Sequence, residues 1–127
     1  MGYLLKAELE NANILQYGEV IVIRFVKKVK VTEEDALNIS LKIIELANRN
    51  KHTLLFDAKK VLFLSQEARE IFSKQQSPKF FAVAILVETA FQRAFANLHM
   101  KARKSTTPYK IFTKEQKAIE WLKEYLN

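Results

Sequence analysis

Residues 53–72 read TLLFDAKKVLFLSQEAREIF and decide the fold. Thr53–Phe56 predict a buried strand, because the run is apolar and short. Asp57 follows as an acidic residue at the end of that strand. After a loop, Ser65 has the hydroxyl expected of a helix cap, and Gln66–Ser73 predict a short helix. The order of strand, acid, loop and capped helix indicates an α/β protein.

The rest of the chain predicts strands and helices in alternation. VIVIRF at 20–25 is rich in β-branched residues, and FFAVAILV at 80–87 is continuously apolar, as expected for a central strand covered on both faces. The remaining predicted strands are Tyr3–Leu9, Ile14–Tyr17 and Tyr109–Phe112, and the remaining helices are Thr32–Asn50, Thr89–Arg103 and Thr113–Leu126. In the first of these helices, the positions expected to face the core are Ala36, Leu37, Ile39, Ile43, Ile44, Leu46 and Ala47.

Three of the helix starts repeat one capping pattern. A threonine is followed three residues later by a side chain that accepts a hydrogen bond, in the pairs Thr32 and Asp35, Thr89 and Gln92, and Thr113 and Gln116. Such pairs satisfy free backbone N–H groups in both directions. Strands that alternate with capped helices predict parallel βαβ units with right-handed crossovers, and the first strands predict an antiparallel edge. We therefore expect one domain over residues 1–127, with a mixed, mostly parallel sheet of about five strands and four helices.

Composition excludes several classes of site. The 127 residues contain no cysteine, which excludes disulfides, thiol catalysis and cysteine-ligated metals. The chain has no glycine-rich phosphate loop, no nucleophile elbow and no histidine spacing typical of a metal site, so we expect neither an enzyme nor a bound cofactor or metal. The longest apolar run, Phe80–Val87, is too short to span a bilayer, and without a signal peptide we expect a cytoplasmic location.

Positive charge is concentrated in the second half of the chain. Residues 1–58 contain eight basic and eight acidic residues, whereas residues 59–127 contain thirteen and six, so the formal net charge of +7 lies entirely in the second half. The asymmetry is compatible with an anionic partner or with a solvated basic surface, and the second interpretation is favoured. No exposed aromatic motif indicates binding to nucleic acid.

Two stretches resemble a known family. VLFLSQEAREIF after FDAK resembles the segment that follows the third strand of SpoIIAA-like (STAS) domains, and residues 85–126 resemble small stand-alone bacterial STAS-like proteins. The matching positions in the second stretch are Arg93, Asn97, Lys101, Lys104, Pro108, Phe112, Thr113, Ala118, Trp121 and Leu122. The resemblance covers about residues 14–126. It implies a SpoIIAA-like β-α superhelical fold, distantly related to CRAL-TRIO lipid-binding domains.

The resemblance also implies a switch that this chain does not carry. The best-understood members are anti-sigma-factor antagonists, in which a partner kinase phosphorylates a serine at the start of the second helix. Aligned with that pattern, Ser65 falls on the aspartate and Gln66 on the phosphorylated serine. Ser65 is therefore interpreted as a plain helix cap, since Glu67 and Glu70 would oppose a phosphate there.

Asp57 lies where open α/β sheets bind ligands, at the carboxyl end of a strand. Three roles stand in order of preference: an anchor that accepts hydrogen bonds from loop amides or pairs with Lys59 or Lys60, a binding contact, and a catalytic base. Catalysis ranks last because it needs a convergent partner.

The helix predicted at Thr89–Arg103 has two stripes. Phe91, Ala94, Phe95, Leu98 and Ala102 are expected to pack on the sheet. Arg93, Asn97, Lys101 and Lys104 form a second stripe, which is either a solvated face or a footprint for an anion or a membrane surface. An exposed Phe80 or Phe91 would mark a homodimer or partner patch.

The sequence therefore predicts a non-enzymatic STAS-like regulatory or protein-interaction module that lacks the usual phosphoacceptor serine. Its candidate contacts are the surface of the second helix, including Ser65, Gln66 and Arg69, and the basic stripe of the third helix. The expected partner is a protein that the sequence does not identify. The alternative is a small anionic or lipid-like ligand bound near the strand ends.

Overall fold

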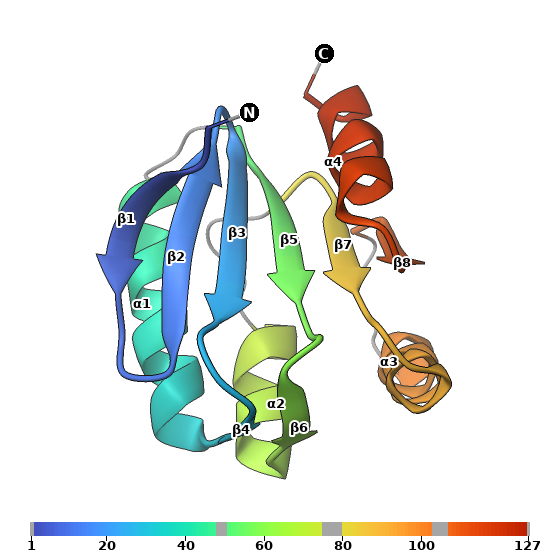
Figure 1. Ribbon diagram of the computed structural model, residues 1–127. Coiled ribbons are helices and arrows are strands. Elements are labelled where there is room, and N and C mark those ends of the chain that lie inside the picture. Colours follow the sequence, from blue (N-terminus) through green and yellow to red (C-terminus); the bar gives the residue numbers. More distant parts are fainter. Residues whose placement is uncertain (1, 48–50, 75–79, 103–106, 127) are drawn as a thin grey trace.

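The computed structural model describes residues 2–47, 51–74, 80–102 and 107–126 (Figure 1). Its strands are β1 (Leu4–Glu8), β2 (Ala12–Tyr17), β3 (Val20–Phe25), β4 (Val29–Val31), β5 (Thr53–Asp57), β6 (Val61–Leu64), β7 (Val83–Leu86) and β8 (Tyr109–Phe112). Its helices are α1 (Glu33–Ala47), α2 (Gln66–Lys74), α3 (Ala90–Ala102) and α4 (Glu115–Glu124). The predicted α/β class is confirmed.

Six strands form the main sheet, in the order β1-β2-β3-β5-β7-β8. The first three pair antiparallel, as expected, and the connection between β2 and β3 turns at Gly18, whose positive φ of 59° suits glycine. β3, β5, β7 and β8 pair parallel. The predicted number of about five strands is wrong. Each of the six stretches that the sequence predicted as strands forms a strand of this sheet, including β1, most of whose residues are exposed.

A second sheet of two parallel strands, β4 and β6, lies beyond the carboxyl ends of the main strands (Figure 1). Neither strand was expected. β6 lies in the segment that the sequence indicated as a loop, and β4 has three residues, too few to show a periodic pattern. Lys30 of β4 pairs with Phe63 of β6, so folding joins two segments that are 33 residues apart.

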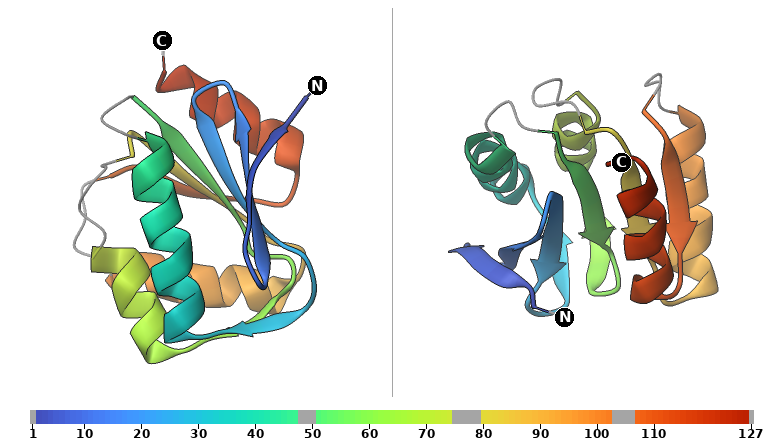
Figure 2. Two further views of the ribbon diagram at one scale, coloured as in Figure 1. Left: turned by 90° about the vertical axis from the view of Figure 1, so that its left-hand side faces the viewer. Right: turned by 90° about the horizontal axis from the view of Figure 1, so that it is seen from above.

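The main sheet is covered on both faces. α1 and α2 lie over one face and α4 over the other (Figure 2). On the first face, Ile21 and Ile23 of β3 pack against Ile39 and Ile43 of α1. α3 reaches the same face at β7 and β8, where Ala96 meets Ile85 and Val87. On the opposite face, a cluster that includes Val22, Leu55, Leu86 and Leu122 joins α4 to β3, β5 and β7.

Two of the three predicted capping pairs are present. Thr32 and Asp35 exchange hydrogen bonds at the start of α1, and Thr89 and Gln92 do so at the start of α3. The pair predicted at Thr113 is wrong, because α4 begins at Glu115 after Lys114, with no side-chain hydrogen bond at the cap.

Two helices turn part of their apolar surface to solvent. In α1, Ile39 and Ile43 are buried as expected, but Leu37 and Ile44 are exposed. In α3, Phe91 and Leu98 were expected on the sheet and are exposed instead. α3 meets the sheet through Ala96, about a third of a turn from the predicted face. The physical reason is that a small residue allows the helix to approach the sheet closely.

Candidate functional site

A cluster of charged side chains lies at the carboxyl ends of β3 and β5. The two strands pair in register, so that Arg24 lies beside Asp57. Arg24 Nη1 donates to Asp57 Oδ2 at 2.8 Å, and the Lys59 amide donates to Asp57 Oδ1 at 3.1 Å. The Lys59 ammonium is 3.9 Å from Asp57 Oδ2. Asp57 is buried, and both of its carboxylate oxygens accept a hydrogen bond.

Glu115 brings the first turn of α4 into this cluster. The Arg24 guanidinium donates to both Glu115 oxygens, at 2.6 and 3.1 Å. This hydrogen bond raises the pKa of Arg24 and lowers the pKa of Glu115. The Tyr3 hydroxyl also donates to Glu115, and the Arg24 guanidinium lies 5.6 Å from the centre of the Tyr3 ring. Burial is the main cause that raises the pKa of Tyr3 to about 12, with the Glu115 hydrogen bond second.

The cluster joins four parts of the chain: the segment before β1, the ends of β3 and β5, and α4. The sequence indicated Asp57 but not Arg24, Glu115 or Tyr3, because each lies far from Asp57 along the chain. These contacts are those of a loop anchor, since Asp57 is engaged by an amide and by a guanidinium. Within the described residues, no group of three or more metal-ligating side chains is placed to hold a metal ion.

Ser65 begins α2 as its cap. Its hydroxyl accepts a hydrogen bond from the Ala68 amide at 3.0 Å, and its own amide donates to the Val31 carbonyl of β4. The Gln66 side chain is exposed and donates to Glu70 at 3.4 Å. The structure therefore shows Ser65 in the capping position that the sequence indicated, and any further role of either residue stays a prediction.

Among the described residues of the predicted interaction set, Arg69 of α2 and the polar stripe of α3 lie on different sides of α3. Arg69 of α2 lies over the Phe95 ring of α3, with its guanidinium carbon 5.8 Å from the ring centre. Arg93 and Asn97 are exposed, but helical spacing places them on the side of α3 away from Phe95. The Lys101 side chain and Lys104 lie outside the described part of the chain.

A different surface at this end of the molecule combines exposed apolar side chains with positive charge. Leu62 and Phe63 of β6 are 57% and 52% exposed, and Phe91 and Leu98 of α3 are 76% and 68% exposed. α3 is joined to the segment before β6 and to α2, since Gln92 donates to the Lys59 carbonyl at 2.9 Å and Arg69 contacts Phe95. We call this surface the strand-end face, made up of Lys28, Lys30, Lys60, Leu62, Phe63, Arg69, Phe91 and Leu98.

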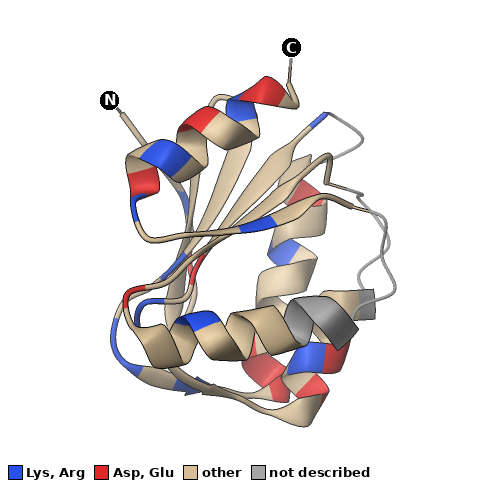
Figure 3. Ribbon diagram, turned by 90° about the vertical axis from the view of Figure 1, so that its right-hand side faces the viewer, with Lys and Arg blue, Asp and Glu red and all other residues tan. Residues whose placement is uncertain are grey.

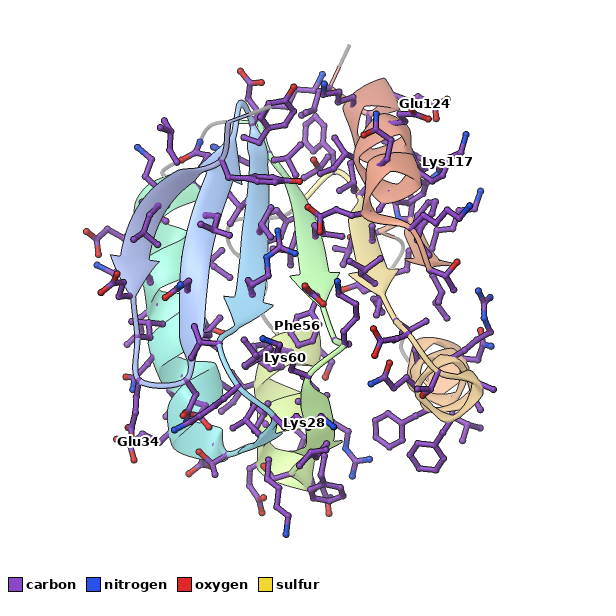
Figure 4. All side chains as sticks on the ribbon, in the orientation of Figure 1. Lys28, Glu34, Phe56, Lys60, Lys117 and Glu124 are labelled. Atoms are coloured by element: carbon purple, nitrogen blue, oxygen red, sulfur yellow. The ribbon has the colours of Figure 1, made fainter. Side chains whose placement is uncertain are left out.

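Folding assembles the charge of this surface from both halves of the sequence. Residues 26–32 (VKKVKVT) and 58–66 (AKKVLFLSQ) together contain five lysines and no acidic residue. The pairing of β4 with β6 brings the two segments together, and Figure 4 shows Lys28 and Lys60 near one another. In Figure 3, Lys and Arg segments follow the loops at this end of the sheet, and the acidic residues nearby belong to the first turn of α1 and to α2. A comparison of net charge between the two halves of the sequence could not reveal this cluster of lysines, because its members come from both halves.

No helix among the described residues has the length and apolar character needed to cross a bilayer.

Comparison with known proteins gives a fold and a family. The structure is similar to the crystal structure of an uncharacterised protein of the DUF3478 family with a SpoIIAA-like fold, from Shewanella loihica PV-4. The TM-score is 0.67 at 18% sequence identity, over 93% of this chain and 98% of that one, which confirms the predicted SpoIIAA-like fold. No curated protein matches the chain. The model of a family described as a domain of unknown function, DUF7793, matches residues 14–126, and the chain belongs to that family.

Proposed function

We propose that this protein is a non-enzymatic protein-interaction module and that its partner docks on the strand-end face. The observation that carries the proposal is the exposure of Leu62, Phe63, Phe91 and Leu98 beside a cluster of lysines. Scattered apolar side chains are common on surfaces, but four large exposed ones at one end of the molecule are typical of an interaction site. The sequence predicted that an exposed Phe91 would mark a homodimer or partner patch, and Phe91 is exposed.

The charge on this surface indicates the chemistry of the partner. Lys28, Lys30 and Lys60 form no ion pair within the described residues. A partner with acidic groups around apolar anchors would pair with these lysines at the rim and bury the apolar side chains at the centre. Complete burial of an aromatic or aliphatic side chain of this size contributes roughly 1.5–3 kcal/mol. Phe63 and Phe91 are therefore expected to contribute most to binding.

The test compares the proteins that the wild type and two variants capture from a lysate. Wild-type protein, Phe63→Asp and Lys60→Glu are immobilised and exposed to a lysate of the producing organism, and bound proteins are quantified by mass spectrometry. We expect a specific protein that the wild type retains, that Phe63→Asp loses by at least about tenfold, as for the removal of a central anchor, and that Lys60→Glu retains less than the wild type, as for the reversal of a charge at the rim. The recombinant partner is then titrated against each variant by calorimetry.

Leu4→Asp is the matched control. Leu4 is 63% exposed and lies on β1, an edge strand of the main sheet that contributes no residue to the strand-end face, so this variant should capture the partner as the wild type does. Equal capture by wild type, Phe63→Asp and Lys60→Glu would contradict the proposal. Flotation with vesicles of phosphatidylglycerol is a second measurement, and binding to them that the same substitutions abolish would replace the protein partner with a lipid surface. The alternative of a small anionic or lipid-like ligand stays a prediction.

A further inference from the structure

A second apolar surface lies on α1, away from the strand-end face. Leu37, Leu41 and Ile44 recur at steps of four and three residues, so they share one side of the helix. They are 46%, 64% and 42% exposed. The core contacts of α1 use other positions, such as Ile39 and Ile43. This side of the helix is therefore not needed to hold α1 on the sheet.

Acidic residues border this surface. Glu33 and Glu34 precede Leu37 by four and three residues, and Glu45 follows Leu41 by four, which places all three next to the apolar positions. Glu45 pairs with Lys42 at 3.0 Å, whereas Glu33 and Glu34 form no ion pair among the described residues. We call Glu33, Glu34, Leu37, Leu41, Ile44 and Glu45 the α1 stripe.

The α1 stripe and the strand-end face are complementary. Each presents large apolar side chains, and the charges around them have opposite sign. The two surfaces adjoin at the start of α1, where Glu33 follows Lys30 by three residues, but α1 is fixed on the sheet by its buried side, so its apolar side chains cannot turn onto the strand-end face of the same molecule. A contact between the two surfaces therefore requires two molecules.

We propose that the strand-end face binds the α1 stripe of a second copy of this chain. The inference rests on the proposed function, because it names one partner for the same face. In such a contact Leu41 lies against Phe63 and its neighbours, while Glu33 and Glu34 lie near the lysines. The two surfaces differ, so the contact is heterologous, and each molecule retains one free surface of each kind. Association therefore extends beyond two copies unless the arrangement closes into a ring.

Sedimentation velocity at low ionic strength tests this arrangement with two one-sided variants. We expect the mean mass of the wild type to rise with protein concentration and to fall on addition of salt, which screens charge pairs at the rim. Leu41→Lys disrupts the α1 stripe, and Phe63→Asp disrupts the strand-end face. Each variant alone should remain monomeric, because the surviving surface has no counterpart. An equimolar mixture should form a complex of two chains, since the intact face of the first variant fits the intact stripe of the second.

Leu4→Asp is again the control and should associate as the wild type does, while circular dichroism verifies that each variant is folded. A wild type that stays monomeric at every concentration would overturn the inference, and so would a mixture that forms no complex. A dimer of Phe63→Asp alone would also overturn it, because that result indicates symmetric pairing of α1 with α1. Each of these outcomes leaves the proposed function standing, since its own test measures capture of a specific protein from a lysate and does not require that protein to be a second copy of this chain.

Discussion

Replacement of Arg24 by methionine is expected to lower the free energy of unfolding by about 3 kcal/mol, because it leaves carboxylates without their cation. Arg24 is the common partner of Asp57, at 2.8 Å, and of Glu115, at 2.6 Å. Asp57 is buried, so solvent cannot replace the lost contact. Glu115 is partly exposed and contributes less. Urea unfolding followed by circular dichroism measures the change.

Lys42→Met provides the matched control. It removes a lysine from a salt bridge on the surface of α1, with Glu45 at 3.0 Å, and should change the free energy of unfolding by less than about 0.5 kcal/mol. Equal effects of the two substitutions would contradict the role assigned to Arg24.

The difference in unfolding free energy between wild type and Arg24→Met is also expected to depend on pH. Arg24 holds the pKa of Glu115 below its ordinary value of 4.5 in the folded state. A carboxyl group of this kind stabilises the fold above its unfolded pKa, and the contribution is lost as the pH falls through the folded pKa. The difference in unfolding free energy between wild type and Arg24→Met should therefore narrow below about pH 4.5. A difference that stays constant through this range would exclude a contribution from Glu115.

Two neighbouring isoleucines of α1 are expected to differ sharply on substitution. Ile43 is 1% exposed and packs in the core under the sheet, whereas Ile44 is 42% exposed. Ile43→Ala should lower the free energy of unfolding by about 3 kcal/mol, since it leaves a cavity that the surrounding side chains fill only in part. Ile44→Ala should change it by less than about 1 kcal/mol. Urea unfolding of both variants measures the contrast, and similar losses would contradict the orientation of α1.

The contrast between Ile43 and Ile44 shows how much of helix orientation the periodicity of apolar residues can predict. The pattern predicted the helix and placed Ile43 correctly, but it also placed Ile44 and Leu37 in the core. A helix that rests on a sheet buries one side, and the exact direction of that side depends on the neighbours that it meets. In α3 the same limit turned Phe91 to solvent, because Ala96 makes the close contact with β7.

Local hydrogen bonding was predicted well where both partners lie within one turn. The pairs at Thr32 and Thr89 formed because the donors and acceptors are three residues apart, within one turn of helix. At Thr113 the prediction was wrong. The neighbouring residue Glu115 is engaged by Arg24 and Tyr3, and α4 begins there without a side-chain cap. α4 therefore begins at the residue that forms these long-range hydrogen bonds, two residues after the predicted cap at Thr113.

The sequence alone determined the α/β class, the order of most elements, the antiparallel start and the SpoIIAA-like fold. The SpoIIAA-like fold was implied by the resemblance of two stretches to that family, whereas the other properties follow from apolar periodicity and from hydrogen bonds between near neighbours, which are both present in the linear order of residues. Only the tertiary structure decided the partners of Asp57 and the composition of the strand-end face. Arg24 joins Asp57 to Glu115 because the ends of β3 and β5 and the start of α4 lie at one place, and Lys30 meets Phe63 because β4 pairs with β6. Such contacts depend on strand pairing and helix packing over long separations, and no local pattern specifies them.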